Sequence, residues 1–139
     1  MKLLIFLLIA ISPYFCEAQE VKQDRFRSTV KLEEVISGHL QELNGKYKIR
    51  ISETTYEPGG SIGEHHSIGP GIRYVKSGEL TYVQNDTTRI YREGTYFYES
   101  GDVVHTASNK GEKAVIIINF EVVPADWKGA SHIPVPKSN

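Results

Sequence analysis

Three histidines and a glutamate, in two short stretches of this 139-residue chain, are residue types that bind metal ions. Glu64, His65 and His66 are consecutive, and His105 lies in a second stretch bounded by turn residues. Imidazole suits Zn, Fe, Mn or Ni, and a carboxylate adds charge to such a site. Tight binding needs at least three protein ligands. The sequence therefore predicts a divalent metal site made by these four side chains, provided that the fold brings the two stretches together.

Each of these histidines also has a purely structural interpretation. His65 and His66 would then be a solvated pair in a turn. His105 would be a core histidine whose ring is hydrogen-bonded to a backbone carbonyl. His39 and His132 lie outside both stretches, and the sequence assigns them no role.

Short strands separated by regularly spaced turns must position these side chains. Asn44-Gly45 is a strong hairpin signal, because both residues tolerate positive φ. Tyr47, Ile49 and Ile51 then alternate with polar residues, as in a half-buried strand. Further extended runs cover residues 72–75, 79–84, 87–91, 95–99, 103–107 and 114–123. This pattern predicts an all-β sandwich or barrel.

The chain start has the pattern of a secretory signal peptide. Lys2 precedes an apolar run over residues 3–11, and Ala18 ends a stretch suitable for cleavage, so residues 1–18 are predicted to be removed. The run is too short to cross a bilayer, which takes about 20 residues. A buried first strand or helix, or a lipid anchor at Cys16, are the alternatives. The mature protein is thus expected to be exported, periplasmic or secreted, and without disulfides.

The regions on either side of the barrel carry weaker patterns. Residues 19–44 are predicted to hold a loose leader and a short first strand at 31–36. The barrel itself is assigned to residues 45–123. The tail, residues 124–139, has three prolines and is expected to wrap the outside of the barrel, with Trp127 in a groove. The net charge of −1 gives no reason to expect a nucleic-acid partner.

The first histidine stretch resembles the first motif of the cupin superfamily. Gly59, His65 and Gly78 match that motif. Ser67 stands where the motif has its second histidine, and Gly71 stands where it has a glutamate. Two of the four usual metal-ligand positions therefore differ.

The second histidine stretch resembles the second cupin motif. Gly94, His105 and Asn109 match, Ser100 replaces a proline, and a glycine is displaced by one position to Gly101. The resemblance implies a single small cupin-type β-barrel, a jelly-roll-like double-stranded β-helix. It also implies a homodimer formed through swapped or paired edge strands.

The resemblance implies an inward direction for Arg73. In cupins position 71 points into the barrel, and side chains two apart on a strand share a face. An unpaired buried charge is very costly. Arg73 would therefore either clamp an anionic group of a ligand or form an internal ion pair with Glu53, Glu64 or Glu99.

Two tyrosines complete the candidate site. Tyr96 and Tyr98 share a face by parity and are the predicted aromatic contacts of a substrate. Three functions remain open at this point. The first is a metal-dependent enzyme of the dioxygenase, isomerase, decarboxylase or lyase type. The second is a metal-free module that binds or senses a small anionic or polar molecule, and the third is a purely structural barrel in an envelope assembly.

Overall fold

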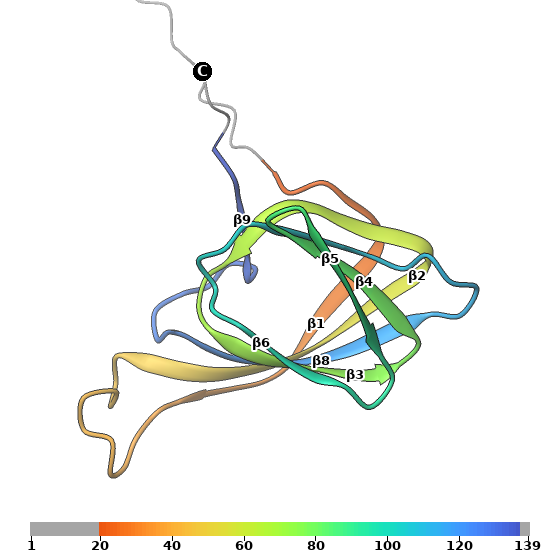
Figure 1. The fold of residues 1–139 in the computed structure, drawn as a ribbon. Helices are drawn as coiled ribbons and strands as arrows, with labels where there is room; N and C mark the ends of the chain where they lie inside the picture. The colour runs from red at the N-terminus through yellow and green to blue at the C-terminus, as the bar shows by residue number, and fades with distance from the viewer. Residues whose placement is uncertain (1–19, 137–139) are drawn as a thin grey trace, which may run out of the picture.

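A computed structural model describes residues 20–136 as an antiparallel β-barrel (Figure 1). Its strands are β1 (Gln23–Val35), β2 (Tyr47–Ser67), β3 (Gly71–Ser77), β4 (Glu79–Gln84), β5 (Thr87–Arg92), β6 (Tyr96–Glu99), β7 (His105–Ser108), β8 (Val115–Pro124) and β9 (His132–Pro134). Within these residues no helix has the length and apolar character to span a membrane. The predicted signal peptide and Cys16 lie outside the described residues.

The long strand β2 organises the sheet. Its first half, residues 47–56, pairs with β8 on one edge and with β1 on the other. Its second half pairs with β7 and β9. The strand order along the sheet is β5-β4-β7-β2-β8-β3-β6. Figure 1 shows that this sheet curls round on itself. Strands far apart in the sequence thus come to line one interior.

β2 passes from one wall of the barrel to the other at Pro58-Gly59-Gly60. Gly59 has φ +74°, which L side chains rarely adopt. A Cβ on Gly60 would collide with the backbone carbonyl of Arg25. The sequence predicts that Pro58 ends the strand, but the glycines let it bend and continue to Ser67.

The predicted strands of the barrel are confirmed, whereas the predictions for the two ends were incomplete. Strands β3 to β8 begin and end within two residues of the predicted ranges. Residues 23–35 form one continuous strand instead of a loose leader and a short strand. The tail adds β9 to β2 instead of only wrapping the outside, and Trp127 is only partly buried. Both segments are strands because the edges of β2 offer them backbone partners.

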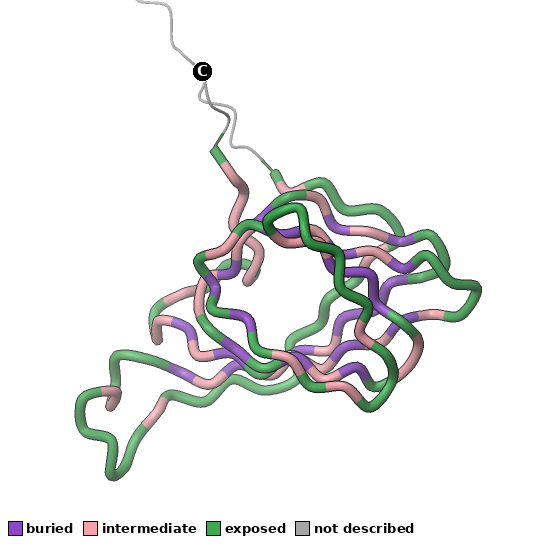
Figure 2. Tube along the Cα trace, in the orientation of Figure 1, coloured by how far each residue is buried: buried purple, intermediate pink, exposed green. Residues whose placement is uncertain are grey.

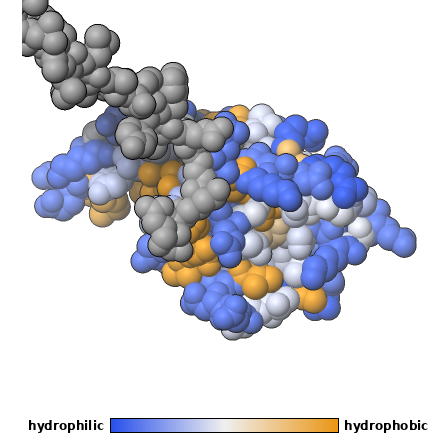
Figure 3. Space-filling view, turned by 90° about the horizontal axis from the view of Figure 1, so that it is seen from above, coloured by the Kyte–Doolittle hydropathy of each residue, from blue (hydrophilic) through white to orange (hydrophobic). Residues whose placement is uncertain are grey.

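The barrel interior is apolar toward one end and charged toward the other. Figure 2 shows buried residues alternating with more exposed ones along the strands. The apolar cluster contains Tyr56, Ile62, Val75, Leu80, Tyr82, Ala107, Val115 and Ile117. The buried charged residues are Lys48, Arg50, Arg73, Glu99 and Glu121. Seen from above, the surface mixes hydrophobic patches with hydrophilic edges (Figure 3).

Candidate functional site

Three imidazoles lie together inside the barrel. His65 on β2 and His105 on β7 are opposite each other in the strand pairing, and their ring centroids are 4.2 Å apart. His132 on β9 adds a third ring, whose centroid lies 5.0 Å from that of His65. The expectation that histidines from the two stretches meet inside the barrel is confirmed. The third histidine comes from the tail, where the sequence assigned no role.

The backbone fixes one nitrogen in two of these rings. His65 Nδ1 lies 2.7 Å from the carbonyl oxygen of Gly63, and His105 Nδ1 lies 3.0 Å from that of Val103. A carbonyl only accepts hydrogen bonds, so Nδ1 carries the proton in each ring. In His105, Nε2 also lies 3.5 Å from Oε1 of Glu99. Both nitrogens of that ring face oxygen acceptors.

The imidazoles of His65 and His132 are uncharged at neutral pH. Burial, reinforced by the charge of His105, lowers the pKa of His65 from 6.5 to about 3. Burial and the nearby guanidinium of Arg73 lower the pKa of His132 to about 4. Each neutral ring can accept one hydrogen bond and donate another.

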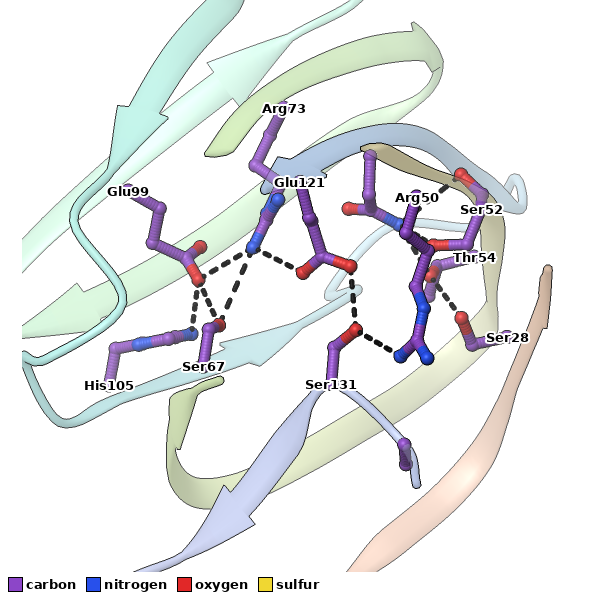
Figure 4. Close-up of polar contacts among 12 residues, drawn as sticks. Ser28, Arg50, Ser52, Thr54, Ser67, Arg73, Glu99, His105, Glu121 and Ser131 are labelled. Atoms are coloured by element: carbon purple, nitrogen blue, oxygen red, sulfur yellow. Dashed lines mark hydrogen bonds and ion pairs between the residues drawn. The ribbon is translucent and has the colours of Figure 1, made fainter. Parts of the chain in front are cut away.

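The guanidinium of Arg73 lies between two carboxylates (Figure 4). Its Nη2 is 3.0 Å from Oε1 of Glu99 and 3.0 Å from Oε1 of Glu121. Ser67 Oγ donates to the same Glu99 oxygen at 2.5 Å. Of the three acids predicted as internal partners of Arg73, Glu99 is confirmed, while Glu121 was not foreseen.

Attraction between the opposite charges of this buried group outweighs the cost of removing those charges from water. Burial alone would lower the pKa of Arg73, but Glu99 and Glu121 raise it. Burial alone would raise the pKa of Glu99, but Arg73 and His105 hold it below its ordinary value. Arg73 and Glu99 are therefore charged at neutral pH and stabilise each other.

The polar network continues from this group to the C-terminal segment. Ser131 Oγ donates to Oε2 of Glu121 at 2.6 Å, and Arg50 Nη1 donates to Ser131 Oγ at 3.2 Å. Arg50 Nε in turn lies 2.7 Å from Oε1 of Glu33. A chain of charged and hydroxyl groups thus links β1 and the tail to the barrel interior. Figure 4 shows the contacts of Ser131 with Glu121 and Arg50.

The cavity enclosed by these side chains is small and hydrogen-bonding. Its volume is about 40 Å³, which is room for about three water molecules. The hydroxyls of Ser52, Thr54 and Tyr82 line it together with the three imidazoles. The Tyr82 ring also stacks on His105, with centroids 4.8 Å apart. A molecule that enters without rearrangement of the wall has few heavy atoms and many hydrogen-bond partners.

The residues around Arg73 do not fit the metal site that the two motifs imply. A Cβ on Gly71 would lie 2.5 Å from Arg73 Nη1 and would collide with the carbonyl oxygen of Phe120, so a carboxylate side chain has no room there. At the other changed position, Ser67 supplies a hydroxyl already bonded to Glu99. Among residues 20–136, no three His, Cys, Asp or Glu side chains are placed to hold one metal ion.

Several residues of the predicted site lie outside the cavity. Glu64 and His66 point to the other face of β2, because side chains alternate along a strand; Glu64 is exposed and His66 half-buried. Tyr96 and Tyr98 are 66% and 65% exposed on the outer face of β6. The four-ligand metal set and the aromatic substrate contact are therefore not assembled in this structure. His65, His105 and Arg73 do line the cavity.

The cavity also contains residues that the sequence left without a role. Glu121 carried a signal, because an acid within the long apolar run of β8 requires a polar partner. His132 carried none, since its position depends on the docking of β9 against β2.

The sequence that builds this barrel and its polar interior site matches the family model of the cupin domain over residues 52–121. The chain belongs to the cupin family, and its fold is an all-β cupin barrel. A small-molecule-binding or enzymatic role is consistent with this family.

Similar solved structures share the fold at low sequence identity. An uncharacterized conserved protein with a double-stranded β-helix domain from Klebsiella pneumoniae has a TM-score of 0.56 and 21% identity, covering 80% of this chain and 86% of that chain. A predicted oxalate decarboxylase from Thermotoga maritima has a TM-score of 0.55 and 15% identity, covering 75% and 91%. KdgF from Halomonas sp. has a TM-score of 0.54 and 13% identity, covering 74% and 86%. A comparison with curated proteins finds no match.

Proposed function

We propose that this cupin barrel binds a small, uncharged, hydrogen-bonding molecule in its interior cavity without a metal ion. The observation that carries the proposal is the guanidinium of Arg73, held by Glu99 and Glu121 in the space beside Gly71. It is a permanent cation, and it engages the two carboxylates that a metal ion would need. A divalent ion next to it would be repelled.

The balance of charge argues against an anionic ligand. Glu99 and Glu121 contribute two negative charges, and Arg73 contributes one positive charge. His105 adds a second positive charge when it is protonated. With His105 protonated the four side chains have no net charge, and with His105 neutral they carry one net negative charge. In neither state does the group attract an anion. The sequence left open whether the ligand is anionic or polar, and the charge balance favours a polar, uncharged one.

The cavity wall offers hydrogen-bond partners to such a ligand. Among the described residues, Nη1 of Arg73 is buried without a hydrogen-bond partner. A buried donor left unsatisfied costs about 1–3 kcal/mol, so an acceptor oxygen on a ligand would recover part of that cost. The neutral ring of His65 offers Nε2 as an acceptor, because its Nδ1–H is bonded to Gly63, and the neutral ring of His132 can offer a donor and an acceptor.

Acetamide and acetate test this proposal, because the two molecules match in size and differ in charge. We expect acetamide to shift the NMR signals of the His65 and His105 rings in a saturable way, and acetate to leave them unchanged. A ceiling of about 1.5 kcal/mol per heavy atom limits a four-atom ligand to a Kd no tighter than tens of micromolar. His65→Gln should weaken binding about tenfold, whereas Tyr96→Ala, outside the cavity, should not. Tighter binding of acetate than of acetamide would contradict an uncharged ligand.

A metal-dependent enzyme is the second candidate. It is favoured by one observation: His65 and His105 each donate Nδ1–H to a carbonyl, as metal-bound histidines commonly do. Elemental analysis of protein purified from the export compartment separates the two candidates. We expect far less than one Zn, Fe, Mn or Ni per chain. A stoichiometric metal that is lost in both His65→Ala and His105→Ala would support the enzyme instead.

Export belongs to the same proposal. It rests on the signal-peptide pattern of residues 1–18 and gives a mature chain that starts at Gln19. N-terminal sequencing of the exported protein checks this cleavage, and a full-length chain retained in the cell would contradict it. We expect the partners to be a small molecule and a second copy of the chain, with no nucleic acid.

A further inference from the structure

A hollow beside the inner cavity is enclosed by β1, β2 and the C-terminal segment. Its volume is about 170 Å³, against about 40 Å³ for the inner cavity. The two spaces share walls formed by Ser28, Ser52, Ser131 and His132. Arg50 lines the hollow but not the inner cavity. The hollow therefore has a charged group of its own, and this hollow is called the Arg50 hollow below.

The charged residues at the Arg50 hollow carry one excess positive charge. Lys48 and Arg50 are 4% and 3% exposed. Both contact the same oxygen, Oε1 of Glu33, at 3.0 and 2.7 Å. The hydrogen bonds from Lys48 and Arg50 lower the pKa of Glu33, so this carboxylate is charged at neutral pH. Two buried cations thus share one carboxylate, and a buried charge without a counterion is costly.

The buried acid next to this group is paired inside the barrel. Ser131 Oγ accepts a hydrogen bond from Arg50 and donates one to Oε2 of Glu121 (Figure 4). The other oxygen of Glu121 lies 3.0 Å from Arg73. Glu121 therefore belongs to the group that has one net negative charge when His105 is neutral. The protein interior is negative on the cavity side of Ser131 and positive on the side of the Arg50 hollow.

The guanidinium of Arg50 has a nitrogen left for a ligand. Its Nε is bonded to Glu33, and its Nη1 donates to the carbonyl oxygen of Gly129 at 2.9 Å and to Ser131 Oγ at 3.2 Å. Among the described residues, none accepts a hydrogen bond from Nη2. A guanidinium bonds most strongly to carboxylate or phosphate oxygens, because the hydrogen bond is then charge-assisted.

Two serine hydroxyls add further donors to the same wall. The amide nitrogen of Asn119 donates to Ser52 Oγ at 3.1 Å and to Thr54 Oγ1 at 2.9 Å. Thr54 in turn donates to Ser28 Oγ at 3.0 Å. Ser52 and Ser28 thus accept from within the protein, and within residues 20–136 neither O–H has an acceptor. A hydroxyl in this state can donate to a ligand, so this wall suits an anion.

Part of the wall is apolar and indicates what the anion carries. Phe26 and Val30 project from the same face of β1 as Ser28, and Val30 is 51% exposed. Ligand sites commonly combine such apolar walls with a few polar groups that fix orientation. The single excess positive charge matches one negative charge, and the nearby carboxylate of Glu33 would repel a second one. A monoanion with a short apolar part therefore fits better than a dianion such as phosphate.

We propose that the Arg50 hollow binds a small monocarboxylic acid. Its carboxylate accepts hydrogen bonds from Nη2 of Arg50 and from the hydroxyls of Ser28 and Ser52, and its apolar part lies against Phe26 and Val30. This site is separate from the inner cavity, whose charges disfavour an anion. The inference does not depend on what occupies the inner cavity.

Calorimetric titration with butanoate at neutral pH tests the site. We expect saturable binding with a Kd of about 1 mM, well within the limit for six heavy atoms. Arg50→Gln should raise the Kd at least tenfold, because a charge-assisted hydrogen bond is lost. Arg27→Gln is the matched control and should leave the Kd unchanged, because Arg27 is exposed on the opposite face of β1 from Ser28.

NMR during the same titration locates the bound molecule. The backbone amide signals of Ala130 and Ser131, which line the hollow, should shift. The ring signals of His65 and His105, which report on the inner cavity, should not. Failure of this inference thus leaves the proposed function of the inner cavity untouched.

Two other anions distinguish the sources of a bound carboxylate or phosphate. Peptides also end in a carboxylate, so N-acetylvaline is titrated in parallel with butanoate. Saturable binding of either carboxylate supports the site, and the tighter ligand names the source; the small volume of the hollow leads us to expect butanoate. Phosphate at equal ionic strength should bind more weakly than both.

Three results would overturn the proposal. The first is the absence of saturable carboxylate binding up to about 50 mM, far above the expected Kd. The second is an equal Kd for wild type and Arg50→Gln. The third is tighter binding of phosphate than of either carboxylate. Should Arg50→Gln fail to fold, Ser28→Ala at an exposed position should raise the Kd about threefold to tenfold, and an unchanged Kd in that variant would equally count against the site.

Discussion

At the scale of single residues, Arg73 determines the chemistry of the barrel. The sequence left two roles open, a clamp for a ligand anion and an internal ion pair. The internal pair is present, because Glu99 and Glu121 both lie 3.0 Å from the guanidinium and all three side chains are buried. Among the described residues, Nη1 of this guanidinium has no hydrogen-bond partner and remains for an external acceptor. One side chain thus supplies the interior cation and a hydrogen-bond donor for a ligand.

Removal of this cation should be strongly destabilising. Arg73→Met leaves Glu99 and Glu121 as buried carboxylates without the guanidinium between them, which should lower the free energy of unfolding by about 3–5 kcal/mol. Lys76→Met is the matched control on the same strand, because Lys76 is 53% exposed and pairs with Glu53 at the surface. The control should cost no more than about 1 kcal/mol. Urea unfolding of both variants measures the difference.

A triple variant separates charge from packing. Arg73→Met/Glu99→Gln/Glu121→Gln removes all three charges, and replacing a complete buried ion group is often far less costly than breaking it. It should therefore be more stable than Arg73→Met alone. If the triple variant is the less stable of the two, the hydrogen-bond geometry and not the charge holds this part of the barrel together.

At the scale of elements, the short strand β9 decides how far the cavity extends. It pairs with β2 over three residues only. His132 lines the inner cavity and also two outer hollows of about 170 and 550 Å³. Ser131, just before the strand, bonds to Glu121. The segment forms the wall between the inner cavity and the larger hollows, and its displacement would admit a bulkier ligand.

Ending the chain after Ala130 should open this wall without unfolding the barrel. The amide of Ile68 donates to the carbonyl of Ser131 at 2.8 Å, so it should exchange with deuterium much faster in the shortened protein. Ser131→Ala, which keeps β9 but loses the hydroxyl contacts to Glu121 and Arg50, should cost about 1–3 kcal/mol and leave the Ile68 amide protected. Hydrogen exchange read by mass spectrometry distinguishes the two variants. Unchanged protection of Ile68 after truncation would show that β9 does not close the cavity.

The sequence was sufficient to predict the central strands, because turn residues and the alternation of apolar with polar side chains are local features of the chain. Gly45 and Gly94 have φ values of 71° and 86°, as the predicted turns require. The two-residue period of a strand also predicted that His65 and Ser67 share a face. The inward direction of Arg73 needed the cupin resemblance as well, because the period alone does not say which face is inside.

The rest of the site depended on information that the local pattern lacks. Parity paired Tyr96 with Tyr98 but did not say which face of β6 is inside; the strand turns Phe97 and Glu99 inward instead. β1 is exposed along almost its whole length and shows no clear strand alternation, so its backbone bonds to β2 are what extend it as a strand. His132 reaches the cavity by the same kind of tertiary pairing.

At the scale of the whole molecule, a polar interior inside an apolar outer sheet makes stability depend on pH. The pKa of His65 falls from 6.5 to about 3 on folding, and that of His132 falls to about 4. Between these values and 6.5 the unfolded chain binds more protons than the folded chain, so stability decreases as pH falls. The contribution of each ring is complete above about pH 6.5, and for each proton the loss reaches about 1.4 kcal/mol per pH unit. The lowered pKa of Glu99 acts in the same direction at lower pH.

Urea unfolding between about pH 4 and pH 8, an interval in which histidines of the unfolded chain take up protons, should therefore show the free energy of unfolding falling steeply below about pH 6.5. The double variant His65→Gln/His132→Gln should flatten this dependence, because the two groups that take up protons on unfolding are gone. His39→Gln removes an imidazole from an exposed loop position and should keep the wild-type slope. An equal slope in wild type and the double variant would mean that these two rings do not resist protonation in the folded barrel. The cavity would then be wetter, and better suited to an anion, than the buried neutral imidazoles indicate.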